Sequence, residues 1–208
     1  MGSRRVTIVL RLVVAALSLA AVTTQLGVTI ANGYSIVNFF SYFTNLSNLF
    51  GSGVLVVGAV LLSRRPSRDL DARWRGAAVV YLVLVGVVFN LLLRDTDLGD
   101  LKPWVNLVVH GVMPVAVLVD WLVWPPERRP AARWVGIWLL VPAVYVAYSL
   151  VRGALTGFYP YPFFDPDRSG GYAGVATYCA GMLAGFLVMA VLVRWLAGVR
   201  LWTAHRQR

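Results

Sequence analysis

Two side chains that can cooperate in acyl transfer, a threonine and a histidine, lie in otherwise apolar stretches of this sequence. Thr44 belongs to the polar cluster Phe39–Asn48, and His110 is the only histidine within an apolar segment. A threonine hydroxyl is a weak nucleophile until a base removes its proton, and neutral imidazole can do so near neutral pH. We therefore predict that Thr44 and His110 meet and form a nucleophile–base pair.

Polar residues around this pair could bind a substrate or donate hydrogen bonds to a developing oxyanion. In a helix Thr44, Ser47 and Asn48 share one face, because residues i, i+3 and i+4 are neighbours. The same residues, and His110 itself, could instead form hydrogen bonds that only hold neighbouring helices together. The candidates for substrate binding or oxyanion stabilisation are Asn45, Asn48, Asn90, Ser47 and Asn106.

The segments that carry these residues are long and apolar. The chain has 208 residues, of which 59% are hydrophobic and 13% are charged. Because about 20 apolar residues span a bilayer as a helix, such runs predict transmembrane helices. We predict an all-α, polytopic six-helix transmembrane bundle in a single domain covering residues 1–208, with helices at roughly 6–31, 36–62, 74–93, 104–124, 134–151 and 174–199.

The basic residues predict the orientation of this bundle. Of the 19 Lys and Arg residues, only Arg94, Lys102, Arg152 and Arg168 flank one set of alternate helix ends, and all others flank the opposite set. The positive-inside rule then places both termini in the cytoplasm. Arg11 lies early in the first helix, and we expect its side chain to extend back to the membrane surface. The Arg-rich, Lys-poor usage is typical of GC-rich genomes, so we expect a multi-pass protein of a bacterial cell membrane.

This orientation brings Thr44 and His110 to a similar depth. Each lies about six residues into its predicted helix, which at ~1.5 Å per residue is about 9 Å below the outer boundary. The loop 157–166 is rich in aromatic residues and proline, and could cover a site that opens outward. Asp120 cannot orient the imidazole, since it lies about 15 Å from His110 along the same helix, and nothing in the sequence shows that Asp95 or Asp97 of the outer loop folds in to do so. We expect Asp120 to meet Arg64 or Arg65 at the inner rim, or to cap a neighbouring helix.

Composition gives little basis for a metal, a cofactor or a nucleic acid. With a single cysteine, Cys179, the chain cannot form an internal disulfide or a cysteine-based metal cluster. The other histidine, His205, lies in the polar tail, so a pair of intramembrane haem ligands is not expected. The net charge of +10 is concentrated between the apolar runs, a pattern that favours anionic membrane lipids over nucleic acid. We predict no metal and no cofactor, and membrane lipids as neighbours.

Three stretches of the sequence form recognisable motifs. They are Phe-Thr-Asn-Leu-Ser-Asn at 43–48, Asn-Leu-Val-Val-His-Gly-Val-Met-Pro at 106–114 followed by Asp120-Trp121, and Tyr-Pro-Tyr-Pro-Phe-Phe-Asp from Tyr159. The first two resemble the androgen-induced membrane hydrolase family, and the third is similar to its bacterial branch, the Pr-six-Pr membrane proteins. Animal members are multi-pass hydrolases of fatty acid esters of hydroxy fatty acids. The resemblance implies Thr44 as the nucleophile and His110 as the base.

These observations lead to one main hypothesis and two alternatives. A Thr–His pair near the outer leaflet would act on an acyl ester of a lipid, through an acyl-threonine intermediate that water then hydrolyses. We therefore expect an intramembrane threonine hydrolase whose substrate partner is a lipid ester. The alternatives are a protein that binds or transports lipids through the same polar residues, and a structural or regulatory membrane protein. Neither an inverted repeat nor a broken-helix pair, both typical of transporters, is visible in the sequence.

Overall fold

The computed structural model describes residues 2–65, 69–97 and 99–206, and the regular structure within these ranges is helical. Six helices are long and apolar enough to cross a membrane, which confirms the predicted six-helix, all-α chain. Two of them contain a π-helical turn, and a short helix and a 3₁₀ turn lie outside the spans. The elements are α1 (Gly2–Ala31), α2 (Ile36–Phe40), α3 (Phe43–Arg64), α4 (Ala72–Val88) with η1 (Phe89–Leu93), α5 (Pro103–Leu107) with η2 (Val108–Val112) and α6 (Met113–Val123), α7 (Arg133–Thr156), η3 (Pro162–Phe164) and α8 (Gly171–Arg206).

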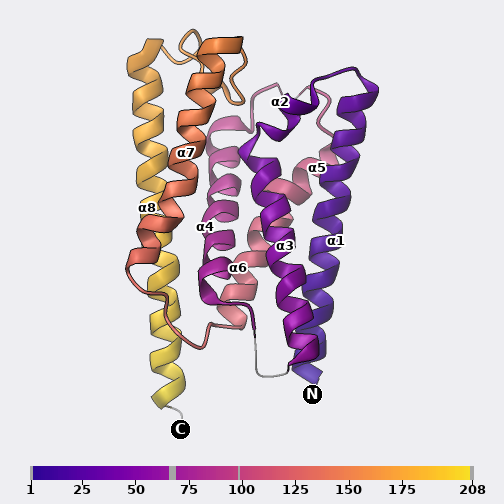
Figure 1. Cartoon of the computed structure of the whole chain (residues 1–208), viewed down its shortest axis with the longest axis vertical. Coiled ribbons are helices and arrows are strands. Elements are labelled where there is room, and N and C mark those ends of the chain that lie inside the picture. The colour runs from indigo at the N-terminus through magenta and orange to yellow at the C-terminus, as the bar shows by residue number, and fades with distance from the viewer. Residues whose placement is uncertain (1, 66–68, 98, 207–208) are drawn as a thin grey trace.

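The helix α4 runs through the middle of the bundle. It contacts α3, α6 and α8, while α1 packs along α3 and α7 packs along α8 (Figure 1). The two ends of the chain lie at one end of the bundle, and α2 and the loop between α7 and α8 lie at the other (Figure 1). Large apolar side chains such as Leu91 and Leu155 remain exposed on the outer faces, as expected where a helix borders lipid.

Small residues let α4 approach its neighbours closely. A Cβ at Gly76 would lie 2.6 Å from the ring of Trp138, which is itself fully buried. A Cβ at Gly86 would lie 3.0 Å from the carbonyl oxygen of His110 and 3.1 Å from the ring of Pro114. Small residues at helix contacts are a common device of membrane bundles. Here Gly86 brings α4 directly against the turn that carries His110.

The predicted helix 36–62 is wrong in one respect, because it is broken at Ser41 and Tyr42. Tyr42 has extended backbone angles, φ −81° and ψ 125°, and α3 begins at the next residue. The backbone carbonyl of Ser41 accepts a hydrogen bond from the Tyr145 hydroxyl at 2.9 Å, and the hydroxyl of Ser41 lies 2.8 Å from that of Tyr148. Tyrosines of α7 thus bind the polar groups freed by the break. Thr44 therefore lies in the first turn of α3 rather than six residues inside a helix.

A second correction concerns the end of the bundle near the termini, where Arg11 does not extend to the surface. Its side chain is 3% exposed, with Nε 2.6 Å from Asp120 Oδ1 and Nη1 2.7 Å from Asp69 Oδ1. Arg75, 4% exposed, contacts the same two carboxylates, at 2.8 Å from Asp120 and 2.9 Å from Asp69. Asp120 therefore meets Arg11 and Arg75 and not the Arg64–Arg65 pair. Two cations and two anions neutralise one another, which is how charges become tolerable in a buried site.

The position of Asp69 in the loop before α4 completes this four-residue charge cluster. Burial by itself would raise the pKa of Asp69, but the hydrogen bond from Arg11 and the charges of Arg75 and Arg11 outweigh it and hold the pKa below its usual range. The carboxylate is consequently ionised near neutral pH. The cluster joins α1, α4 and α6 at one end of the bundle.

Candidate functional site

The structure brings Thr44 and His110 together. The hydroxyl oxygen of Thr44 lies 3.3 Å from Nε2 of His110, within reach of proton transfer. Thr44 is buried in the first turn of α3, and His110 is part-buried in η2 of the neighbouring span. The positive end of the α3 dipole lies at this same turn, so negative charge that develops near Thr44 is favoured there.

Asn106 orients the imidazole of His110 from one turn earlier on the same span. Its side-chain oxygen lies 2.6 Å from Nδ1 of His110. Because an amide oxygen can only accept a hydrogen bond, Nδ1 carries the ring proton and Nε2 keeps a free electron pair. That electron pair faces the Thr44 hydroxyl. The arrangement Thr–His–Asn follows the logic of triads in which an asparagine holds the histidine that activates a nucleophile.

Tyr161 is a further member of the site that sequence reasoning did not identify. Its hydroxyl lies 3.1 Å from the Thr44 hydroxyl and accepts a hydrogen bond from the Thr44 backbone N–H at 3.2 Å. Burial raises the pKa of Tyr161 above its ordinary value, so the phenol stays protonated and can donate a hydrogen bond. The flanking prolines, Pro160 and Pro162, were the available signal, because they fix the backbone and aim the ring between them.

The loop that carries Tyr161 folds over the bundle and contributes side chains to its interior. Phe163 and Phe164 are buried, and Tyr161 stacks on Phe163 with ring centroids 5.1 Å apart. The ring of Tyr159 occupies the space above Gly153 on α7, where an added Cβ would collide with the ring. Because Gly153 has no side chain, Tyr159 of the loop can pack directly against α7.

Two π-helical turns on adjacent spans face one another at His110. In η2 the backbone N–H of Met113 donates to the carbonyl of Val108, five residues back. The imidazole of His110 stacks on the ring of Phe89, the first residue of η1, with centroids 3.9 Å apart and planes 11° apart. Single π turns in helices are frequent at functional sites because they re-aim side chains. Here they present the two rings to each other across the gap between α4 and the span of His110.

A small cavity adjoins the pair. Its volume is about 50 Å³, and its walls come from α3, α4, η1, η2, α7, α8 and the loop of Tyr161. That volume admits a few water molecules, since one occupies about 10–15 Å³ on this measure. Most of the lining is apolar, and the polar side chains among it are Thr44, His110, Tyr145 and Tyr161.

The other predicted oxyanion or substrate-binding residues do not line this cavity in the described part of the chain. Asn45 donates to the carbonyl of Phe39 at 2.7 Å, and Asn90 is exposed and donates to its own helix at Gly86. Ser47 donates back to the carbonyl of Phe43 at 2.7 Å, a bond within its own turn. These side chains serve local structure. Amide and hydroxyl groups in spans often bind nearby carbonyls in this way.

Asn48 is a special case because it connects the two halves of the site. It is fully buried and donates to the carbonyl of Thr44 at 2.8 Å and to that of Val109 at 3.2 Å. Its side-chain oxygen lies 3.3 Å from the hydroxyl of Ser18 on α1. One amide therefore ties the turn of Thr44 to the turn of His110. Asn48 positions the pair and does not touch the cavity.

Comparison of the chain with family models, with curated proteins and with solved structures gives no match. The likeness to the androgen-induced membrane hydrolases therefore depends on the three motifs alone. All three motifs contribute to one place in the fold, since Thr44, His110 and Tyr161 come from the first, second and third.

Proposed function

We propose that the protein is a membrane-embedded threonine hydrolase that cleaves lipid esters of the fatty acid ester of hydroxy fatty acid type. The observation that carries this proposal is the continuous set of contacts from Asn106 through His110 to Thr44 beside an apolar cavity. A nucleophile, a base and a group that orients the base are the three parts that covalent ester hydrolysis needs.

The reaction has two halves. The Thr44 hydroxyl attacks the ester carbonyl while its proton passes to Nε2 of His110, and the tetrahedral intermediate then expels the alcohol, which takes that proton. This leaves an acyl-threonine. Water then attacks the acyl group, giving its proton to His110, and the collapse of the second intermediate releases the fatty acid and returns the proton to Thr44. Asn106 stabilises the positively charged imidazolium in both halves by accepting from Nδ1.

The oxyanion would be stabilised by two groups that now bind each other. The Thr44 backbone N–H points to the Tyr161 hydroxyl, and that hydroxyl also lies beside the Thr44 side chain. A substrate carbonyl oxygen placed between them could accept from both. The positive end of the α3 dipole adds to this stabilisation.

The test is hydrolysis by purified protein of a fatty acid ester of a hydroxy fatty acid, followed by release of the free acid. Thr44→Ala and His110→Ala should each abolish turnover while the thermal melting curve in detergent remains native. Thr44→Ser, which keeps a hydroxyl, should retain part of the activity. A serine-directed fluorophosphonate probe should label the wild-type protein and not Thr44→Ala. Full turnover in Thr44→Ala would refute the proposal.

The second candidate is a protein that binds lipid esters without cleaving them. It is favoured by the small volume and mainly apolar lining of the cavity, which suit a binding site for lipid as well as they suit an active site. In that case the wild type would bind the ester with no release of acid, and Thr44→Ser would change little.

The proposed setting is a bacterial cell membrane, in keeping with the Arg-rich, Lys-poor usage. Both termini would lie in the cytoplasm, as the distribution of the 19 Lys and Arg residues favours. Single cysteines introduced into the loop of Tyr161 and at the chain termini, in a variant lacking Cys179, test it by labelling of intact cells with a membrane-impermeant maleimide. Labelling at the termini but not at the loop would contradict this orientation.

A further inference from the structure

A guanidinium near the C-terminal end of α7 forms no ion pair with any of the described residues. Arg152 donates from Nη2 to the side-chain oxygen of Asn38 at 2.7 Å and lies over the ring of Phe158 at 4.7 Å. Its other terminal nitrogen, Nη1, is buried and has no hydrogen-bond partner among the described residues. None of the ion pairs found in the described ranges involves Arg152. Arg152 as a whole is partly exposed, but a guanidinium nitrogen that is buried without a partner is costly, so the site is suited to receive an anionic oxygen.

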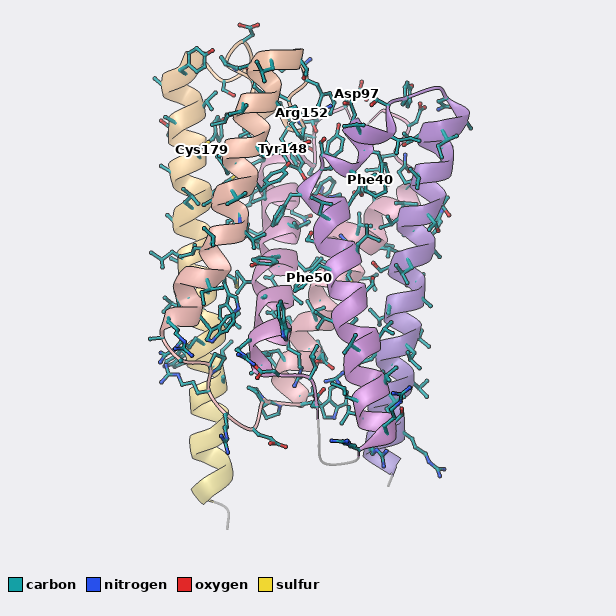
Figure 2. The ribbon with its side chains drawn as sticks, in the orientation of Figure 1. Phe40, Phe50, Asp97, Tyr148, Arg152 and Cys179 are labelled. Atoms are coloured by element: carbon teal, nitrogen blue, oxygen red, sulfur yellow. The ribbon has the colours of Figure 1, made fainter. Side chains whose placement is uncertain are left out.

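The position of Arg152 relates it to the cavity. Tyr145 lines the cavity, and Arg152 follows it by seven residues on α7, so both lie on one helical face. The separation along the helix axis is about 10 Å. Figure 2 shows Arg152 and Tyr148 near the end of the bundle where α2 lies, with Arg152 the nearer to that end. A molecule seated at Thr44 and extending along α7 would therefore pass Tyr148 and reach Arg152.

We propose that Arg152 binds the free carboxylate of the ester substrate, and so selects lipid esters that carry an acid group on the alcohol part. This inference deepens the proposed function and rests on it. The guanidinium fork matches a carboxylate with two parallel hydrogen bonds, one from each terminal nitrogen. Nη1 is free for the first, and Nη2 can exchange Asn38 for the second. Phe158 stacks on the guanidinium plane and holds it in place for this contact.

A phosphate of a neighbouring lipid offers the same anionic oxygen chemistry. In the structure Nη1 is closed off from the surface, so a headgroup that remains in the membrane surface does not contact it. Arg152 does not line the cavity, so a carboxylate must reach it on a chain that extends from Thr44 along the face of α7 that carries Tyr145 and Arg152. The substrate carboxylate is therefore the source that the geometry favours.

The experiment compares two substrates, the palmitate ester of a hydroxystearic acid with a free carboxylate and the methyl ester of the same compound. In dodecyl maltoside, Arg152→Gln should raise KM for the free acid by about tenfold to hundredfold, because a hydrogen bond to a charged group is lost. It should leave KM for the methyl ester unchanged. Arg152→Lys, which keeps the charge without the fork, should restore part of the difference.

Arg168→Gln is the matched control. It removes the same charge from the loop of Tyr161, but its side chain is 73% exposed and already pairs with Asp165 at 3.4 Å. It should change KM for neither substrate. Equal effects of Arg152→Gln on both substrates, or no effect on either, would overturn the inference.

Two further measurements separate the possible failures. In vesicles of phosphatidylcholine with and without phosphatidylglycerol, an Arg152→Gln effect that requires phosphatidylglycerol and is equal for the two substrates would assign Arg152 to lipid phosphate and overturn the inference. If the wild type cleaves neither substrate, the proposed hydrolase fails. Binding of the two compounds to Thr44→Ala then still tests the role of Arg152. A preference for the free acid that is lost in the Thr44→Ala, Arg152→Gln double variant supports this role. Equal binding of the two compounds to Thr44→Ala refutes it.

Discussion

Replacement of Asn106 by leucine tests the proposed mechanism at the residue that touches neither substrate nor nucleophile. Asn106 holds Nδ1 of His110 at 2.6 Å and thereby fixes the tautomer whose Nε2 can accept the proton of Thr44. Leucine has a similar volume but no acceptor, so the ring can carry its proton on Nε2 instead. The loss of one such hydrogen bond amounts to about 1–3 kcal/mol. Expressed as a rate, this is a decrease in kcat of about 5- to 150-fold.

The assay separates this effect from loss of structure. Because Asn106 does not line the cavity, kcat should fall while KM stays near the wild-type value. The rate of labelling by a fluorophosphonate should fall with kcat, since both report the reactivity of Thr44. Asn106→Asp keeps the acceptor and should retain activity. Asn90→Leu is the matched control, because Asn90 is exposed and bonds only within its own helix. A variant Asn106→Leu that melts normally and turns over within twofold of the wild type would refute the orienting role.

Three other perturbations have expected outcomes. Asp120→Asn should lower the free energy of unfolding by about 3–5 kcal/mol, because two buried arginines lose an anion, and denaturation in SDS measures it. Since the pKa of Asp69 lies below its ordinary value of 3.8, the stability it provides is complete above that pH and lost as pH falls through the lower folded value. Melting between pH 6 and pH 3 should show a smaller acid loss in Asp69→Asn than in the wild type. Gly153→Ala should displace Tyr159 and reduce kcat by up to about 100-fold, as expected for a misplacement of about 1 Å. Gly136→Ala on the same helix, with open space around its Cβ, should not.

The sequence predicted the six spans well because membrane helices are specified by long apolar runs, which need no knowledge of packing. The break at Ser41 and Tyr42 could not be read in this way. Neither residue is a helix breaker, and the run 36–62 contains neither proline nor a charged residue. The break depends on the hydroxyls of Tyr145 and Tyr148, which arrive from a distant part of the chain and bind Ser41. A local pattern cannot contain that information.

The candidate site, like the fold, could be predicted only in part from the sequence. Thr44 and His110 were visible as rare polar residues within apolar segments, and the structure brings them to 3.3 Å. Asn106 was visible one turn from His110, but its role as an acceptor for Nδ1 required the orientation of the ring. Tyr161 was hidden because an aromatic loop between spans is usually an interfacial anchor. The depth argument for Thr44 used a helix that in fact begins only one residue before it.

The prediction that the Arg11 side chain extends to the membrane surface was wrong for a physical reason. A single arginine there can extend to the surface at little cost, and that is the usual outcome. Here Asp69, Arg75 and Asp120 come from three other places in the chain and surround it. Such a cluster is visible only when four separate residues are known to converge. The four residues can be seen in the sequence, but their contact with one another cannot.

The two ends of the bundle are held by different forces, and in the proposed hydrolase this difference would decide where a lipid ester enters. Near the termini the cluster of Arg11, Asp69, Arg75 and Asp120 joins α1, α4 and α6, and separating it would expose charges in a medium of low dielectric constant. At the other end the loop of Tyr161 is held by hydrogen bonds between Tyr161 and Thr44 and by contacts between aromatic rings, each of which contributes about 0.5–1.5 kcal/mol. The ring contacts to the bundle are Tyr42–Tyr161, Tyr145–Phe164 and Phe163–Tyr178.

The cavity of about 50 Å³ cannot hold an acyl chain unless part of its wall moves. The loop of Tyr161 and the residues of α7 and α8 that line the cavity include no member of the charge cluster, so displacing this wall separates none of its ion pairs. Thr44 and His110 would stay together during this motion, because Asn48 ties their turns to each other and neither turn belongs to the moving wall. In the proposed hydrolase, opening at the loop would therefore admit the lipid ester to Thr44 and His110 without separating these two residues.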